Sequence, residues 1–253
     1  MKCLRQVLAV YFLSFGLSLG FSGLAGAVDQ VDNSLYADLL NKYVKDGVVD
    51  YQGFKDEENK LDAYLKVLER TDTTKLSRNE QLAFYINTYN ATTIKFILSA
   101  YPGIKSIWDL GGRFFNKPFD KKIVHIEGKT ISLDDLEHGI IRARFKDPRV
   151  HFAVNCASKS CPPLMSEPYQ GSTLDQQLTA ATRAFLNNPG KNYLDGKKLY
   201  VSKIFKWFKK DFNDDVVGFF TRFADEALKR KLLANRDEIK VKYLDYDWSL
   251  NGK

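Results

Sequence analysis

Apolar side chains recur at helical spacing in several stretches of the 253-residue chain. In residues 34–46 they lie three or four positions apart until Gly47, which predicts an amphipathic helix. A second helix of this kind is predicted around residues 61–68. The strongest signal is the capping box SRNE, which opens a helix over residues 77–99 that ends before Pro102.

The helix predicted over residues 77–99 carries apolar side chains on all of its sides, which is typical of a central, buried helix. Its two asparagines, Asn87 and Asn90, then need polar partners, because an unpaired buried amide costs about 1–3 kcal/mol. They either tie the helix to a neighbouring loop or line a site.

Shorter apolar runs bounded by turn residues predict strands. Hairpins are expected over residues 121–133 and around Asp195-Gly196, a buried strand over 149–155, and strand-like segments at 48–51 and 238–248. Further helices are expected over residues 132–145, 173–186, 202–210 and 214–234. This pattern predicts a helix-rich α+β domain over residues 28–253, with an N-terminal helical part and a small antiparallel sheet.

The first 27 residues have the layout of a secretory signal peptide, with Lys2 and Arg5, an apolar stretch, and Ala25-Gly26-Ala27 before polar residues. We therefore expect residues 28–253 to be periplasmic or secreted. No later segment has the roughly 18 apolar residues that a membrane span needs, so no stable membrane insertion is expected after removal of the signal.

The net charge of +7 falls to +5 when the predicted signal is removed. The basic residues are spread along the chain among acids, which favours a solvated basic face over nucleic-acid binding. We expect a small-molecule or peptide ligand, no nucleic acid, and no cofactor.

The segment CASKSC, residues 156–161, holds the two cysteines that remain after signal removal. Three interpretations stay open: a Cys156–Cys161 disulfide in an oxidising compartment, a catalytic thiol, or a metal site. The spacing does not match the redox C-x-x-C motif. The sequence also has no G-x-S-x-G, P-loop, dinucleotide-binding or H-E-x-x-H motif, which argues against those chemistries.

A catalytic thiol needs a neighbouring group that lowers its pKa, and His138, with Glu137 beside it and Arg142 one turn on, is the best candidate. The hypothesis is a thiol-dependent hydrolase or transferase that acts on a peptide, amide or thioester. Its catalytic residues would be Cys156 as nucleophile, His138 as base, Glu137 or Asn87 as orienting group, and Asn90 as oxyanion donor. The substrate-binding residues would be His151, Ser160 and Arg142. The alternatives are a non-catalytic binding module with a Cys156–Cys161 disulfide and a metal-dependent enzyme.

Four motifs together resemble the domain-of-unknown-function 547 (DUF547) family: FYINTYNATTIK, LDDLEHGIIR, RVHFAVNCASKSCPPL and YLDYDWSLN. The resemblance spans roughly residues 35–250 and implies a domain, not a reaction. The polar positions that recur in the family correspond here to Asn87, Asn90, Glu137, His138, His151, Cys156, Ser160 and Cys161. Their restriction to three motifs suggests one shared pocket.

The long capped helix followed by strands is also distantly similar to the papain and transglutaminase-like arrangement. Those enzymes carry the nucleophilic cysteine at the start of the central helix, whereas the helix over residues 77–99 has no cysteine.

Overall fold

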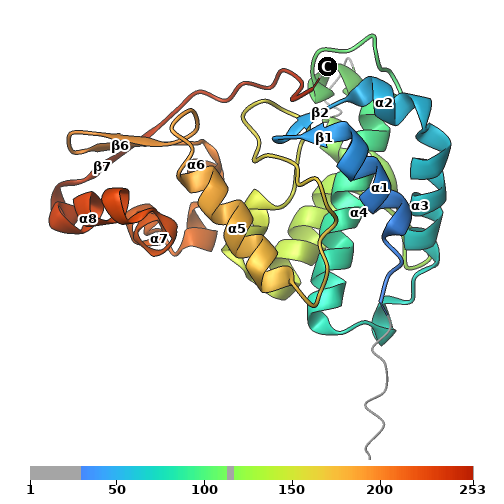
Figure 1. Ribbon diagram of the computed structural model, residues 1–253, viewed down its shortest axis with the longest axis horizontal. Coiled ribbons are helices and arrows are strands. Elements are labelled where there is room, and N and C mark those ends of the chain that lie inside the picture. The colour runs from blue at the N-terminus through green and yellow to red at the C-terminus, as the bar shows by residue number, and fades with distance from the viewer. Residues whose placement is uncertain (1–29, 113–116, 253) are drawn as a thin grey trace, which may run out of the picture.

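The computed structural model of the chain describes residues 30–112 and 117–252. The predicted signal peptide lies outside the described residues. Two clusters of buried apolar side chains organise the fold, one around the N-terminal helices and one around the C-terminal helices. Figure 1 shows these two parts side by side, with the chain returning from the second to the first in its last residues. The single domain over residues 28–253 stays a prediction.

Eight α-helices with these bounds lie in the described residues: α1 Ser34–Tyr43, α2 Tyr51–Asp56, α3 Glu58–Arg70, α4 Arg78–Leu98, α5 Leu174–Leu186, α6 Ile204–Trp207, α7 Val216–Phe223 and α8 Glu226–Ala234. Short 3₁₀ helices occupy Thr73–Lys75, Ile107–Leu110, Pro118–Asp120, Pro148–Phe152, Lys209–Phe212 and Arg236–Glu238. A π-helix covers Asp135–Phe145. The predicted majority of helices is confirmed.

The strands are short: β1 Val44–Lys45, β2 Val48–Val49, β3 Lys122–Ile126, β4 Lys129–Ser132, β5 Tyr193–Asp195, β6 Lys198–Val201 and β7 Lys240–Tyr243. They form two hairpins, β1-β2 and β3-β4, and a three-stranded sheet in the order β5-β6-β7. Both predicted hairpins, at 121–133 and at Asp195-Gly196, are confirmed. The helix-rich α+β class holds, but the expected antiparallel sheet is three separate sheets, and β6 and β7 pair in parallel.

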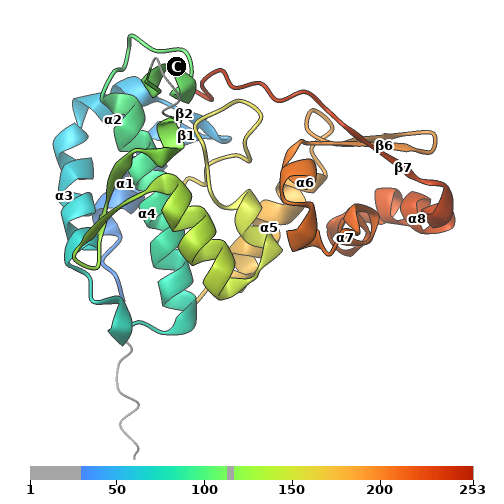
Figure 2. The same cartoon turned by 180° about the vertical axis from the view of Figure 1, so that it is seen from behind.

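Helix α4 is central, as predicted, and nearly all of its side chains are buried. The Ser77 hydroxyl accepts a hydrogen bond from the Glu80 amide and so caps its first turn. The π-helix Asp135–Phe145 packs along α4, and Figure 2 shows it in yellow-green in front of α4. A π-helix is rare and occurs mostly at functional sites.

The buried strand predicted over residues 149–155 is wrong, because a 3₁₀ helix covers Pro148–Phe152. Pro148 favours a helical first turn, and the Asp147 carboxylate accepts a hydrogen bond from the Arg149 amide, which caps that turn. The apolar side chains that suggested a strand are buried, but no strand pairs with them in the described part of the chain.

After β7, residues 244–252 run back over the molecule to the N-terminal helices (Figure 1). This segment makes main-chain hydrogen bonds with residues 157–160 and with Val49 and Lys105. The final residues thus lie against the loop that carries both cysteines. No helix among residues 30–112 and 117–252 combines the length and apolar character needed to cross a bilayer.

Candidate functional site

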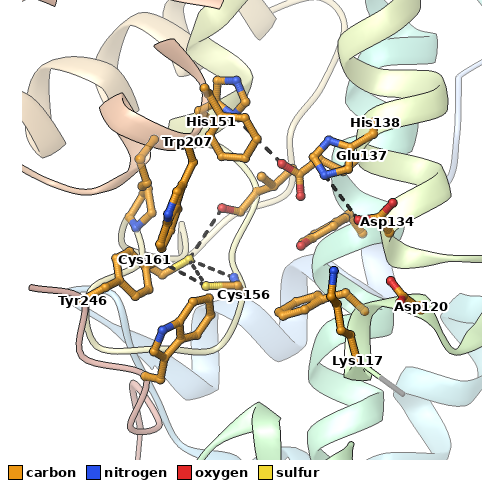
Figure 3. A pocket seen from close by; sticks show the side chains of 17 residues that line it. Lys117, Asp120, Asp134, Glu137, His138, His151, Cys156, Cys161, Trp207 and Tyr246 are labelled. Atoms are coloured by element: carbon orange, nitrogen blue, oxygen red, sulfur yellow. Dashed lines mark hydrogen bonds and ion pairs between the residues drawn. The ribbon is translucent and has the colours of Figure 1, made fainter. Parts of the chain in front are cut away.

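A pocket with a volume of about 160 Å³ opens where the two parts of the molecule meet (Figure 3). A cavity of roughly 150 Å³ holds a molecule the size of benzene. The pocket of this protein is lined by Tyr89, Lys117, Phe119, Asp120, Asp134, Glu137, His138, His151, Val154, Cys156, Cys161, Pro162, Ile204, Trp207, Phe208, Tyr246 and Trp248. It therefore has room for one side chain or one small acyl group at a time.

The loop that carries the cysteines is held by buried amide groups. Asn90 on α4 donates to the Ala153 carbonyl (3.0 Å) and accepts from the Asn155 amide (2.8 Å). The Asn155 side chain spans the loop, because it donates to the Pro162 carbonyl (2.8 Å) and accepts from the Ala157 amide (2.9 Å). These bonds satisfy the main chain where it turns and fix the position of the two sulfurs.

Cys156 and Cys161 face each other across this loop, with their Sγ atoms 2.7 Å apart. Both are free thiols; Cys161 is buried and Cys156 is partly exposed. The Cys156 amide also donates to Cys161 Sγ (2.9 Å). The two sulfurs thus contact each other, and Cys156 is the more exposed of the two residues.

The pKa values of the two thiols shift in opposite directions. Burial alone would raise the pKa of Cys156, but hydrogen bonds from Cys161, from Ser158 (3.2 Å) and from the Tyr246 hydroxyl (3.4 Å) outweigh it and lower the pKa to about 7. Burial and the neighbouring Cys156 sulfur raise the pKa of Cys161 well above its usual value. Cys156 is therefore the sulfur that ionises near neutral pH.

Glu137 lies in the same pocket with little access to water. Burial raises the pKa of its carboxyl group, although the nearby His138 and Arg142 oppose the shift. Its Oε1 atom lies 4.0 Å from His151 Nδ1. A carboxyl group with a raised pKa keeps its proton to a higher pH and can then donate that proton to a bound molecule.

His138 is occupied on both ring nitrogens. Its Nδ1 atom lies 2.7 Å from Arg142 Nη1 and accepts from that guanidinium, while its Nε2 atom lies 3.3 Å from an Asp134 carboxylate oxygen. Figure 3 shows His138 turned toward Asp134, on the opposite wall of the pocket from the cysteines. In the part of the chain that the structure describes, His138 forms no hydrogen bond with Cys156, and Asp134 takes the orienting position predicted for Glu137.

An ionic network holds the side chains of His138 and His151 in place. Arg142 forms two hydrogen bonds with the Asp211 carboxylate (2.7 and 3.0 Å), and His151 Nε2 lies 2.7 Å from the same carboxylate. The hydrogen bonds from His151 and Arg142 hold the pKa of Asp211 well below its usual value, while burial lowers the pKa of His151. Phe208 stacks on the His151 ring with centroids 4.0 Å apart. His151 is therefore fixed in the pocket wall.

The structure brings together in one pocket five of the nine residues predicted for the site: Glu137, His138, His151, Cys156 and Cys161. Arg142 contacts His138 from outside the pocket. The remaining three bond to the main chain. Asn87 pairs with both main-chain groups of Tyr169, Asn90 holds the cysteine loop, and the Ser160 hydroxyl accepts from the Asp247 amide.

The orienting role expected for Asn87 and the oxyanion role expected for Asn90 stay predictions. The side-chain amide nitrogen of Asn87 donates to the Tyr169 carbonyl (2.8 Å), and that of Asn90 donates to the Ala153 carbonyl (3.0 Å). The alternative, in which the asparagines tie α4 to a neighbouring loop, describes their contacts. Neither residue lines the pocket.

Sequence reasoning missed several residues of the site. Asp211 is a lone acid in the basic, aromatic run KIFKWFKKDF, which was the one available signal. Tyr246 and Trp207 belong to no motif whose spacing predicts a role in a site. Asp134 lies near the start of a predicted helix, where acids are common and so give no sign of a site. In the described residues, no group of three or more histidine, cysteine, aspartate or glutamate side chains is placed to hold a metal ion.

A family model described as "Protein of unknown function, DUF547" matches residues 73–186. The chain therefore carries a DUF547 family domain over these residues, a narrower span than the 35–250 expected from the motifs. No curated protein and no solved structure matches the chain. The similarity to the papain-like arrangement stays a prediction.

Proposed function

We propose that this DUF547 domain is a thiol-dependent hydrolase or transferase that acts on a peptide, amide or thioester, with Cys156 as its nucleophile. The observation that carries the proposal is the lowered pKa of the Cys156 thiol, about 7, at the wall of a pocket. The thiolate is the reactive form of cysteine, and a lowered pKa increases the share of Cys156 side chains in this form near neutral pH. Activation of the sulfur then needs no base in contact with it, which is consistent with the position of His138.

The reaction begins when the Cys156 thiolate attacks the carbonyl carbon of the substrate and a sulfur–carbon bond forms. The carbonyl electron pair moves to oxygen, and the Tyr246 hydroxyl, 3.4 Å from the sulfur, is a nearby hydrogen-bond donor to that oxygen. The bond to the leaving group then breaks, and the leaving group takes the proton of Glu137. Water or another nucleophile attacks the thioester, returns a proton to Glu137 and releases the thiolate.

The proposal is tested with an activated ester such as p-nitrophenyl acetate and reduced protein at pH 7.5. We expect one acetyl group on Cys156 by peptide mass mapping, with a burst of nitrophenolate. Cys156→Ser should abolish the adduct and Cys161→Ser should retain it. Glu137→Gln should accumulate the acetyl form, because deacylation loses its proton acceptor. Absence of an adduct on folded, reduced wild-type protein would overturn the proposal.

The contact between the two sulfurs favours a second candidate function, a non-catalytic binding module in which Cys156 and Cys161 form a disulfide. Because the Sγ atoms already touch, closing the bond needs little movement of the loop. This candidate expects an intact mass lower by two hydrogens without reductant, resistant to mild reductant, and similar losses of stability in Cys156→Ser and Cys161→Ser. Loss of function in only one variant, with the fold intact, would exclude it.

A further inference from the structure

All three tryptophans of the chain gather at the mouth of the pocket. Trp207 and Trp248 line it, with ring centroids 5.9 Å apart and nearly parallel planes. Trp108 packs edge-on against Trp248 at 5.2 Å. Trp207 is 47% exposed and Trp108 is 41% exposed, so these rings do not serve the interior packing of the molecule.

Large aromatic rings left open to water at a cavity are typical of binding sites, since burying them against a ligand is favourable. The Tyr246 ring joins Trp207 at 4.8 Å and Trp248 at 4.6 Å, so the rings form a continuous aromatic wall. The faces of such rings attract alkyl groups and cations. The aromatic wall alone does not distinguish between these two.

The opposite wall is acidic. Figure 3 shows Asp120, Asp134 and Glu137 across the pocket from Trp207 and Tyr246. Lys117 is the one lysine or arginine among the described residues of the lining. The pocket thus has an excess of carboxyl groups although the whole chain carries a net charge of +7. Charge complementarity favours a cationic ligand over a neutral or anionic one.

His151, a buried residue of the pocket lining, carries an unpaired acceptor beside Glu137. His151 is 3% exposed, and its Nδ1 atom has no hydrogen-bond partner within the described part of the chain. Its Nε2 atom faces the ionised Asp211 carboxylate, which can only accept, so Nε2 carries the ring proton and Nδ1 presents a lone pair. A buried polar atom without a partner needs an explanation, and a ligand N–H group supplies one.

We propose that the pocket binds an alkylammonium group, which donates to His151 Nδ1, is balanced by the Asp120 and Asp134 carboxylates, and lays its hydrocarbon stem on the tryptophan rings. A lysine side chain or an aliphatic amine has this chemistry. We assign this alkylammonium group to the substrate of Cys156, and this assignment rests on the proposed thiol function. The binding itself does not depend on the thiol.

Intrinsic tryptophan fluorescence reports this site directly, because every tryptophan of the chain lies at its mouth. Reduced protein is titrated with n-pentylammonium chloride and, as its neutral match, with n-pentanol at constant ionic strength. We expect a saturable change with pentylammonium and binding of pentanol that is at least about tenfold weaker. Equal affinities, or no saturable change with pentylammonium, would overturn the inference.

Variants test the acidic wall. Asp120→Asn and Asp134→Asn should each weaken pentylammonium binding about fivefold, the effect of one charge at close range in water. Asp245→Asn is the matched control, because this carboxylate is fully exposed, pairs with Lys203 and does not line the pocket. If Asp245→Asn weakens binding as much as the other two, a general surface charge effect replaces the proposed site.

The alkylation rate of Cys156 by iodoacetamide, measured on the same samples, separates this inference from the proposed function. Saturating pentylammonium should slow the reaction, and pentanol should not. Fast alkylation without pentylammonium binding refutes the alkylammonium site and leaves the thiol proposal standing. Pentylammonium binding without protection of Cys156 refutes the identity of that group as part of the substrate.

Discussion

Replacing Tyr246 by phenylalanine removes one donor to the Cys156 sulfur and keeps the ring. The Tyr246 hydroxyl lies 3.4 Å from Sγ, while its ring packs against Trp207 and Trp248. A hydrogen bond to a charged group contributes about 1.5 kcal/mol at the lower end of the usual range. One pKa unit corresponds to about 1.4 kcal/mol, so Tyr246→Phe should raise the pKa of Cys156 from about 7 to about 8.

The assay is the rate of iodoacetamide alkylation at Cys156 between pH 5.5 and 9.5, with the adduct assigned by peptide mass mapping. At pH 7 the thiolate fraction falls from about a half to about a tenth, while the more basic thiolate is about threefold more nucleophilic. The variant should therefore react about twofold more slowly at pH 7 and about threefold faster above pH 9. The two rate profiles should cross between these limits, which a simple loss of folded protein cannot produce.

Tyr193→Phe is the control. Tyr193, in β5, stacks on Tyr200, in β6, and does not line the pocket. Its profile should match the wild type, with a midpoint near pH 7. A wild-type midpoint near 8.5, the value of an ordinary cysteine, would refute the lowered pKa. An unchanged midpoint in Tyr246→Phe would refute the assigned role of the hydroxyl.

Three further predictions concern the surroundings of the thiols. Oxidation to a Cys156–Cys161 disulfide should raise the free energy of unfolding by about 2 kcal/mol, as expected for a loop of roughly six residues, measured by urea denaturation of the oxidised and reduced forms. Asn90→Ala leaves two buried main-chain groups without partners and should lower the free energy of unfolding by about 2–4 kcal/mol, with a change in the alkylation rate of Cys156; an unaltered rate would contradict its role in holding the loop. Burial lowers the pKa of His151 in the folded state below the unfolded 6.5, so the unfolded state binds the proton more tightly and stability should fall as pH decreases below about 6.5. His151→Gln should lessen this loss, and an identical pH dependence of unfolding in both proteins would contradict it.

The sequence predicted the long helices and both tight hairpins because their signals are local. Ser77 and the Glu80 amide mark the start of α4, and the glycines at 128 and 196 mark two turns with positive φ angles. The strand expected over 149–155 failed because a short apolar run is compatible with more than one conformation once it is buried. The π-helical bonding of Asp135–Phe145 left no recognisable pattern in the sequence.

Part of the pocket could also be anticipated, since Glu137, His138 and Cys156 lie within 20 residues of one another. The partners that determine their chemistry come from far along the chain. Asp211 approaches His151 across 60 residues, and Tyr246 approaches Cys156 across 90. Such contacts depend on how the C-terminal segment packs against the cysteine loop, which no local pattern specifies.

The boundary of the matched family region divides the pocket in two. Glu137, His138, His151 and both cysteines lie within residues 73–186, whereas Trp207, Phe208, Tyr246 and Trp248 lie beyond residue 186. Apart from the Tyr246 hydroxyl, the groups proposed for bond making lie in the matched region, and the rings proposed for ligand selection follow it in the chain. Substitutions at Trp207 or Trp248 can therefore change the preferred ligand without altering a residue of the matched region, whereas Tyr246 also donates to the Cys156 sulfur and so connects ligand selection with the sulfur chemistry.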